Sequence, residues 1–223
     1  MNSEAQFAMA RIEMVEQIEL HAIAVSGRTG RASLAKQVME TMGTVPRHAF
    51  VPIELKAFAY LDRPLPIGFG KTISQPFIVA LMTDLLDVQP QDRILEVGTG
   101  LGYQAAILAK LGKIVYSVEI IQELAREAAN RLRQQGFGNI ELRVGNGSYG
   151  WPEHAPFDKI IVTAAPELIP TALLRQLKPA GKMVIPAGLE DSQQLLLVEK
   201  AQTGLTNITE ILPVRFSLLT ISH

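Results

Sequence analysis

The sequence predicts an α/β protein with a mostly parallel, doubly wound sheet, an antiparallel C-terminal edge and an N-terminal helical extension. Three observations support this fold class. From residue 93 onward, short apolar segments alternate with helical patterns, which is typical of a parallel sheet covered on both faces. The last two apolar segments have no helix between them, which indicates an antiparallel hairpin at one edge. Within residues 1–60, by contrast, two segments carry helical periodicity.

Two helices are expected in the N-terminal extension. The first covers residues 4–20, where the apolar side chains fall on one stripe at helical spacing: Phe7, Met14, Val15 and Ile18. Gly27 and Gly30 end this pattern, and a second helix is expected from about residue 31 to 42.

Residues 61–76 (LDRPLPIGFGKTISQP) are interpreted as a structured loop rather than a flexible linker. Prolines and glycines interrupt any regular periodicity in this segment. Large apolar side chains are nevertheless spread along it, at Leu65, Ile67, Phe69 and Ile73. A helix is expected to follow over residues 77–86.

The remaining elements alternate in a regular order. Strands are expected at residues 93–97, 113–119, 140–144, 158–163, 182–186, 194–199 and 208–216. Helices are expected among them at 103–111, 122–135 and 169–177.

Composition excludes several classes of protein. The 223 residues contain no cysteine, which removes disulfide, thiol-nucleophile and iron–sulfur chemistry and fits a reducing cytoplasm. The net charge of −1 argues against nucleic acid as a partner, because counterion release requires clustered lysines and arginines.

No apolar run approaches the roughly 20 residues of a membrane span, and acidic residues interrupt the N-terminus where a signal peptide would be apolar. A cytoplasmic location without membrane contact is therefore expected. The sequence leaves the oligomeric state open, with a monomer slightly favoured.

The most informative segment is a predicted strand that ends in glycines and opens a helix, Ile94-Leu-Glu-Val-Gly-Thr-Gly-Leu-Gly-Tyr103. In a doubly wound sheet this turn lets a ligand approach the backbone. The dinucleotide pattern G-x-G-x-x-G is not met, because its third position is Tyr103. Glu119 ends the next strand, 21 residues after Gly98, where a carboxylate can accept hydrogen bonds from ribose hydroxyls. These features predict a nucleoside-bearing cofactor.

Glu96 favours one such cofactor over another. A carboxylate two residues before the first glycine would repel a pyrophosphate, whereas it suits the cationic amino group of a methionine moiety. The pattern E-x-G-x-G-x-G after a first strand resembles motif I of the Rossmann-like S-adenosylmethionine-dependent methyltransferases. S-adenosyl-L-methionine is therefore the expected cofactor, and a nicotinamide oxidoreductase is the alternative.

Two other patterns are rejected as functional sites. Gly70-Lys-Thr72 is not a phosphate-binding loop, because the required first glycine is Leu65 and no strand is expected before it. The histidines, at positions 21, 48, 154 and 223, show no metal-ligand spacing. We expect them to have surface or loop roles, and we expect no metal site.

Residues 44–220 resemble the protein-L-isoaspartate O-methyltransferase family. The segments that carry the resemblance are Val45-Pro-Arg-His-Ala-Phe-Val51, Leu65-Pro-Ile-Gly-Phe-Gly-Lys-Thr-Ile-Ser-Gln-Pro76, Leu95-Glu-Val-Gly-Thr-Gly-Leu-Gly-Tyr-Gln104, Pro156-Phe-Asp-Lys-Ile-Ile-Val-Thr-Ala-Ala-Pro166 and Leu177-Lys-Pro-Ala-Gly-Lys-Met-Val-Ile-Pro186. The resemblance implies one methyltransferase domain over residues 1–223. Its parts are an N-terminal helical extension (1–60), an active-site loop (61–76) and a Rossmann-like core (77–223).

The resemblance also implies an activity. The family methylates the α-carboxylate of L-isoaspartyl residues, and more weakly of D-aspartyl residues, in damaged proteins; the ester then closes spontaneously to a succinimide that hydrolyses partly to aspartate. Proteins and peptides that contain isoaspartyl residues are thus the expected partners. A carboxyl of this type has a reference pKa of about 4 and is already an ionised nucleophile at pH 7, so no general base is required. The rival of a different class is a non-catalytic protein that only binds isoaspartyl segments.

Site residues follow from matching motifs. The resemblance places Gly98, Thr99 and Gly100 at the methionine portion of the cofactor, where the charge argument already places Glu96. It places Glu119 at the ribose, and Gly145, Asn146 and Gly147 at the adenine. It places Thr220 near the cofactor, Ser74 at the methyl-transfer centre, and the substrate loop at Ile67, Gly68, Thr72 and Ile73. Three residues depart from the family pattern: Asn146 replaces an aspartate, Ala180 a glycine and Leu218 a proline. The last departure bears on the Thr220 assignment.

Overall fold

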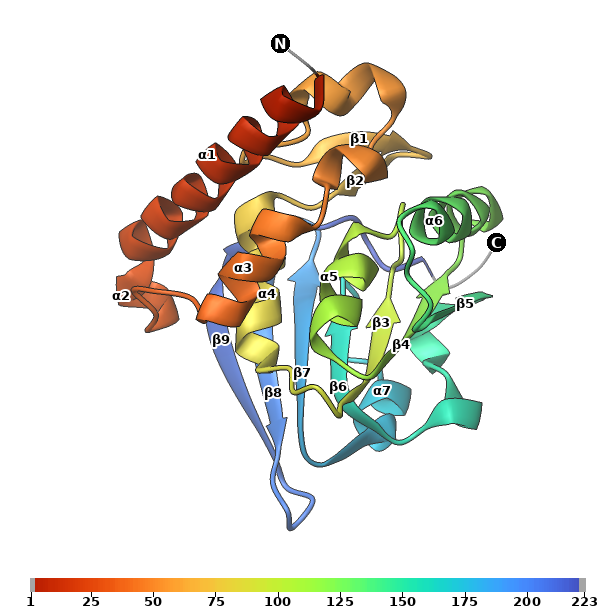
Figure 1. The fold of residues 1–223 in the computed structure, drawn as a ribbon. Coiled ribbons are helices and arrows are strands. Elements are labelled where there is room, and N and C mark those ends of the chain that lie inside the picture. The colour runs from red at the N-terminus through yellow and green to blue at the C-terminus, as the bar shows by residue number, and fades with distance from the viewer. Residues whose placement is uncertain (1–2, 221–223) are drawn as a thin grey trace.

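Residues 3–220 are described in a computed structural model of the chain. Seven strands form one sheet in the order β5-β4-β3-β6-β7-β8-β9 (Figure 1). Their bounds are β3 Arg93–Val97, β4 Ile114–Glu119, β5 Ile140–Val144, β6 Phe157–Val162, β7 Leu177–Leu189, β8 Ser192–Lys200 and β9 Thr206–Val214.

The sheet confirms the predicted fold class. Strands β5, β4, β3, β6 and β7 pair in parallel with their neighbours, whereas β7 with β8 and β8 with β9 pair antiparallel. The hairpin β8–β9 thus forms the antiparallel C-terminal edge, and it extends beyond the parallel strands in Figure 1.

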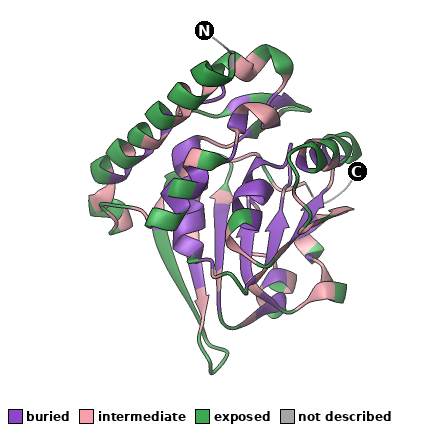
Figure 2. Cartoon of the chain, viewed as in Figure 1, coloured by how far each residue is buried: buried purple, intermediate pink, exposed green. Residues whose placement is uncertain are grey.

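Helices cover both faces of the sheet. Their bounds are α1 Ser3–Ala24, α2 Ser26–Thr29, α3 Lys36–Thr44, α4 Pro76–Leu86, α5 Tyr103–Leu111, α6 Gln122–Gln134 and α7 Thr171–Gln176. One apolar cluster joins one face of the sheet to side chains of α1, α3, α4, α5 and α6, and a second joins the other face to α7. The strands are buried between these layers, while α1 lies outermost with an exposed outer face (Figure 2). Met14, Ile18 and Ala22 are the buried residues of α1.

The second helix was predicted to start too early. The expected start was about residue 31, but α3 begins at Lys36. Asp84 of α4 explains the difference, because its carboxylate accepts hydrogen bonds from the Ala35 amide at 2.7 Å and from the Arg31 guanidinium at 2.6 Å. These long-range bonds hold residues 31–35 outside the helix.

Two other boundaries differ from expectation. The structured loop of residues 61–76 contains an antiparallel hairpin, β1 Leu65–Gly68 and β2 Lys71–Ile73. The helix expected to end at residue 177 ends at Gln176, and β7 starts at once rather than at residue 182. Leu177 already pairs with Phe157 of β6, so the five residues before Lys182 belong to an irregular extension of the strand.

The topology creates a crevice at the carboxyl ends of β3 and β6. The chain leaves β3 toward β4 on one side, and it leaves β6 toward β7 on the other. Ligands of doubly wound sheets bind at such a switch point. The hairpin β1–β2 lies above this edge of the sheet in Figure 1. No helix among residues 3–220 is both long enough and apolar enough to cross a membrane.

Candidate active site

The glycine loop after β3 is held closely against the end of β6. The Thr163 hydroxyl donates hydrogen bonds to the carbonyls of Gly98 at 2.6 Å and Val97 at 3.1 Å. Gly98 has a φ of 96°, and a Cβ there would lie 2.4 Å from the Thr163 Oγ1. Only glycine fits this position without displacement of Thr163.

Glu119 links the glycine loop to the start of α6. Its Oε2 accepts a hydrogen bond from the Gly100 amide at 2.8 Å, and its Oε1 accepts one from the Ile121 amide at 3.0 Å. A carboxylate has about four acceptor sites, so two remain for hydroxyl groups of a ligand. Glu119 also lines the adjoining cavity.

This cavity, which we call the cofactor cavity, encloses about 570 Å³ of empty space when its open mouth is included. Seven of the residues expected at the site line it: Ile67, Thr72, Gly98, Gly100, Glu119, Gly147 and Thr220. Thr163 and Lys71 line it as well, and our sequence reasoning did not name either one as a site residue.

Glu96 lies beneath the glycine loop rather than along this cavity. It is fully buried and accepts a hydrogen bond from the Ser117 hydroxyl, its register partner on β4. The Ser117 hydroxyl also lies 2.6 Å from the Thr99 hydroxyl, and either oxygen can be the donor in that contact. Burial raises the pKa of the Glu96 carboxyl to about 8. Because Glu96 is buried and does not line the cofactor cavity, its contact with a cofactor amino group stays a prediction.

Other expected residues occupy different positions. Asn146 caps a short 3₁₀ helix, Gly147–Tyr149, with its side-chain oxygen accepting from the Ser148 amide at 2.9 Å. Asn146 and Gly145 do not line the cofactor cavity, and neither does Gly68 at the tip of the β1–β2 hairpin. Ile73, Ser74 and Thr99 line a smaller recess next to it.

Ser74 follows β2 and is held by its backbone. Its carbonyl accepts a hydrogen bond at 2.7 Å from the guanidinium of Arg47, which also donates to the Ala59 carbonyl at 2.8 Å. Arg47 is fully buried, and its guanidinium lies 4.9 Å from the centre of the Tyr103 ring. Burial lowers the pKa of Arg47 to about 10, so it stays a cation at neutral pH. From the sequence, Arg47 was notable only as part of Val45–Val51, one of the segments that resemble the family.

Asp62 connects α1 to the same region. Its carboxylate accepts hydrogen bonds from the Phe77 amide at 2.8 Å and the Gln75 side chain at 2.9 Å, and it contacts the His21 Nδ1 at 3.0 Å. The His21 ring stacks on Phe77 with a centroid distance of 4.0 Å. The N-terminal extension therefore contributes directly to the surroundings of Ser74.

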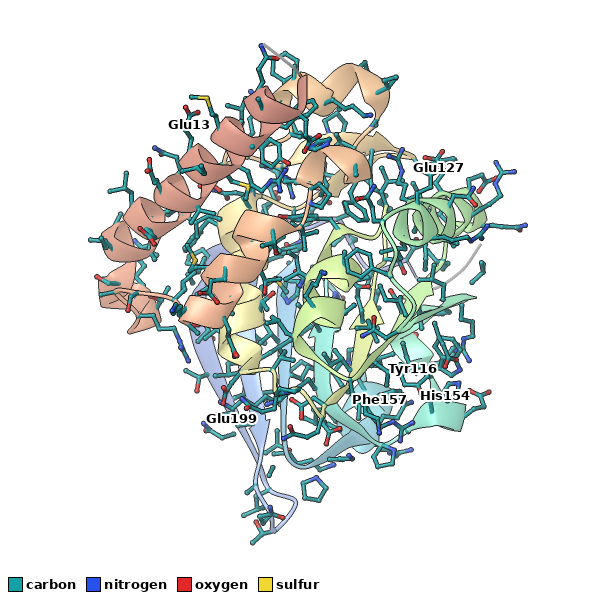
Figure 3. All side chains as sticks on the ribbon, viewed as in Figure 1. Glu13, Tyr116, Glu127, His154, Phe157 and Glu199 are labelled. Carbon is teal, nitrogen blue, oxygen red and sulfur yellow. The ribbon has the colours of Figure 1, made fainter. Side chains whose placement is uncertain are left out.

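The remaining histidines are placed away from the crevice. His48 stacks on Phe7 at 4.0 Å, and His154 stacks on Tyr116 at 4.2 Å. Figure 3 shows His154 beside Tyr116 and Phe157. His223 lies outside the described residues. Within residues 3–220, no group of three or more potential ligands is arranged to hold a metal ion.

A second, more open cleft of about 1320 Å³ adjoins the cofactor cavity. Ser74, Gln75 and His21 line this acceptor cleft. The two spaces share three wall residues, Thr72, Thr163 and Ser217. A donor bound in the first space and an acceptor bound in the second would therefore meet at this wall, and Ser74 lies two residues after Thr72.

The sequence model of the protein-L-isoaspartate(D-aspartate) O-methyltransferase family matches residues 20–222 of the chain. The chain belongs to this family. It is 57% identical over 217 residues to protein-L-isoaspartate O-methyltransferase 1 of Polaromonas sp., covering 97% of this chain and 92% of that protein. It is 55% identical over 218 residues to protein-L-isoaspartate O-methyltransferase 2 of Syntrophobacter fumaroxidans, covering 97% and 88%.

Solved structures agree with this membership. A protein-L-isoaspartate O-methyltransferase structure superposes with a TM-score of 0.80 at 25% identity; the match covers 93% of this chain but only 65% of that one. A Plasmodium falciparum structure described as a β-aspartate methyltransferase in complex with S-adenosyl-L-homocysteine also gives a TM-score of 0.80, at 24% identity and 94% and 98% coverage. At 24% identity, the likeness to the Plasmodium falciparum structure shows the fold alone.

The departure from the family pattern at Leu218 falls in a segment that pairs with Ala165. The segment forms a parallel bridge in which the Ala165 amide donates to the Ser217 carbonyl and the Leu219 amide donates to the Ala165 carbonyl, both at 2.8 Å. The Leu218 amide takes no part in these two bonds, so a proline in its place would preserve them. Thr220 lies just beyond and lines the cofactor cavity.

Proposed function

We propose that the chain transfers a methyl group from S-adenosyl-L-methionine to the α-carboxylate of L-isoaspartyl residues, and more weakly of D-aspartyl residues, in damaged proteins. The methyl ester then initiates repair through a succinimide. The observation that carries the proposal is the common wall of Thr72, Thr163 and Ser217 between the cofactor cavity and the acceptor cleft.

The cavity suits this cofactor on chemical grounds. Gly98 lines the cavity without a side chain that would occupy it, and Glu119 retains acceptor capacity for two ribose hydroxyls. Gly98, Thr99 and Gly100 would hold the methionine portion, while Gly145, Asn146 and Gly147 would lie by the adenine and Thr220 at the edge. When bound, S-adenosyl-L-methionine supplies an electrophilic methyl group.

The protein then has to position the acceptor and exclude water. The acceptor carboxylate is ionised at neutral pH, so Ser74 orients the reacting groups rather than removing a proton. Ile67, Gly68, Thr72 and Ile73 belong to the hairpin that lies over the carboxyl ends of the strands, where it limits access of solvent. Arg47 and Asp62 hold the backbone around Ser74 from two sides.

We also propose that the protein acts in the cytoplasm. The absence of cysteine in all 223 residues supports a reducing compartment.

The test is methyl transfer to an isoaspartyl peptide beside its normal aspartyl twin, with radiolabelled S-adenosyl-L-methionine. We expect esterification of the first peptide and essentially none of the second, because the extra backbone methylene moves the carboxylate relative to the donor. Equal labelling of both peptides would refute the proposed substrate. Calorimetric binding of NAD in place of S-adenosylhomocysteine would favour the oxidoreductase, and cofactor binding without labelling would favour a non-catalytic binder.

A further inference from the structure

The acceptor cleft has an uneven distribution of charge. Arg28 and Arg215 line it, and among residues 3–220 no aspartate or glutamate does. Asp62 lies behind the lining, and its oxygens are already bonded to His21, Gln75 and the Phe77 amide. The cleft is therefore cationic in a protein whose net charge is −1.

The two arginines come from elements that pack against each other. Arg28 belongs to α2, and Arg215 follows the last residue of β9. The buried side chain of Gln193 fixes the backbone next to Arg215, because it accepts a hydrogen bond from the Phe216 amide at 2.6 Å and donates one to the Phe216 carbonyl at 3.1 Å. Arg215 is thus an exposed cation on an anchored segment.

Neither guanidinium has a partner among the residues that the structure describes. Arg28 and Arg215 are both exposed, and neither makes a side-chain hydrogen bond or an ion pair with residues 3–220. By contrast, Arg31, three residues after Arg28, is paired with Asp84 at 2.6 Å. Two free guanidinium groups beside one cleft are available to carboxylates of a bound segment, with which they form charge-assisted bidentate bonds.

Apolar side chains also line the cleft, together with Ser74. We call them its floor, and they belong to Val25, Ile78, Leu212, Val214 and Phe216. A peptide whose isoaspartyl residue reaches Ser74 would lie along this floor, so that its flanking side chains pass the two guanidinium groups.

We propose that Arg28 and Arg215 make the enzyme selective for damaged segments that carry acidic side chains beside the isoaspartyl residue. This inference rests on the proposed function, because it takes the cleft as the place where the methyl acceptor binds. Exposed ion pairs contribute little individually, so we expect a preference of about 3- to 10-fold for glutamate over lysine at the flanking positions. The preference should act on KM and weaken with added salt.

The experiment compares three isoaspartyl peptides that differ only in having glutamate, alanine or lysine on both sides of the isoaspartyl residue. For the wild type we expect kcat/KM to fall in the order glutamate, alanine, lysine, with similar kcat values. The double variant Arg28→Gln/Arg215→Gln should lose most of this order. The variant Arg215→Glu should move the preference toward the lysine peptide.

The matched control is Arg133→Gln, which removes an exposed arginine at the far end of α6 and should leave the order unchanged. Methylation of all three peptides with equal efficiency, or an order that survives the double substitution, would overturn this inference alone. Failure to methylate any of the peptides would overturn the proposed function and the inference with it.

Discussion

The protein holds Ser74 through its backbone carbonyl, so a substitution can remove the hydroxyl without removing that contact. The Arg47 guanidinium fixes the Ser74 carbonyl at 2.7 Å, and the amide of Phe77 in the following helix is capped by Asp62 rather than by Ser74. Removal of the hydroxyl should therefore leave the loop in place. A role as a mere helix cap for Ser74 is correspondingly weakened.

We expect Ser74→Ala to lower kcat by about 100-fold, the order seen when a hydrogen bond aimed at the reacting centre is lost. The KM of the isoaspartyl peptide should change much less. The wild-type rate should stay nearly flat from about pH 6 to 8, because the acceptor is already ionised. Steady-state kinetics over this range test both points. A near-normal kcat would assign Ser74 a structural role, and a steep rise with pH would reveal a general base.

Residues brought to the site from distant elements explain what sequence reasoning missed. The glycine loop and Glu119 follow consecutive strands, so their proximity could be predicted from a repeating pattern. Thr163, Arg47 and His21 reach the same region through tertiary packing, and their hydrogen bonds span 65, 27 and 41 positions of the chain. No local periodicity encodes such contacts.

At the scale of elements, the strands and helices after residue 93 were predictable because their apolar periodicities differ clearly. The elements predicted less well depend on distant groups or on special backbone angles. Asp84 delays the start of α3. The β1–β2 hairpin turns through Phe69, whose φ is 54°, between two glycines with positive φ. The irregular start of β7 contains Ala180, whose φ is 60°.

Ala180 gives a prediction about stability. A left-handed conformation costs a non-glycine residue about 1–2 kcal/mol, whereas the greater flexibility of glycine in the unfolded chain costs about 0.5–1 kcal/mol. Ala180 is exposed, so little packing is lost on substitution. We expect Ala180→Gly to raise the free energy of unfolding by roughly 0.5–1 kcal/mol.

Chemical denaturation of the Ala180→Gly variant beside the wild type measures this change. Ala201→Gly is the matched control, because Ala201 is also exposed but has no positive φ. It should be neutral or destabilising. A loss of stability in Ala180→Gly would show that the methyl group contributes more than the strain it causes.

At the scale of the whole molecule, the N-terminal extension and the sheet share a core. The buried side chains Met14 and Ile18 of α1 belong to the same apolar cluster as Ile94 and Val115 of the central strands. We therefore propose that residues 1–223 unfold as one domain, so that a change at one buried group is measured by the stability of the whole chain.

Glu96 makes that global stability depend on pH. Its pKa is about 8 in the folded protein, raised by burial, and about 4.3 in an unfolded chain. Between these values the folded state retains a proton that the unfolded state has released, so the free energy of unfolding must fall as pH rises. The stabilising contribution is complete below the unfolded pKa and is lost as pH rises through about 8.

Glutamine resembles the protonated form of Glu96 and does not titrate. We therefore expect the stability of Glu96→Gln relative to wild type to increase from pH 5 to pH 9, by at most about 1.4 kcal/mol per pH unit. Urea unfolding followed by circular dichroism at several pH values measures this difference. Glu13→Gln controls for the loss of one negative charge, since Glu13 lies on the exposed face of α1 (Figure 3). If the free energies of unfolding of Glu96→Gln and wild type differed by the same amount at every pH, Glu96 would have to be ionised in the folded protein over the whole range. The hydrogen bonds from Thr99 through Ser117 would then have to stabilise its charge.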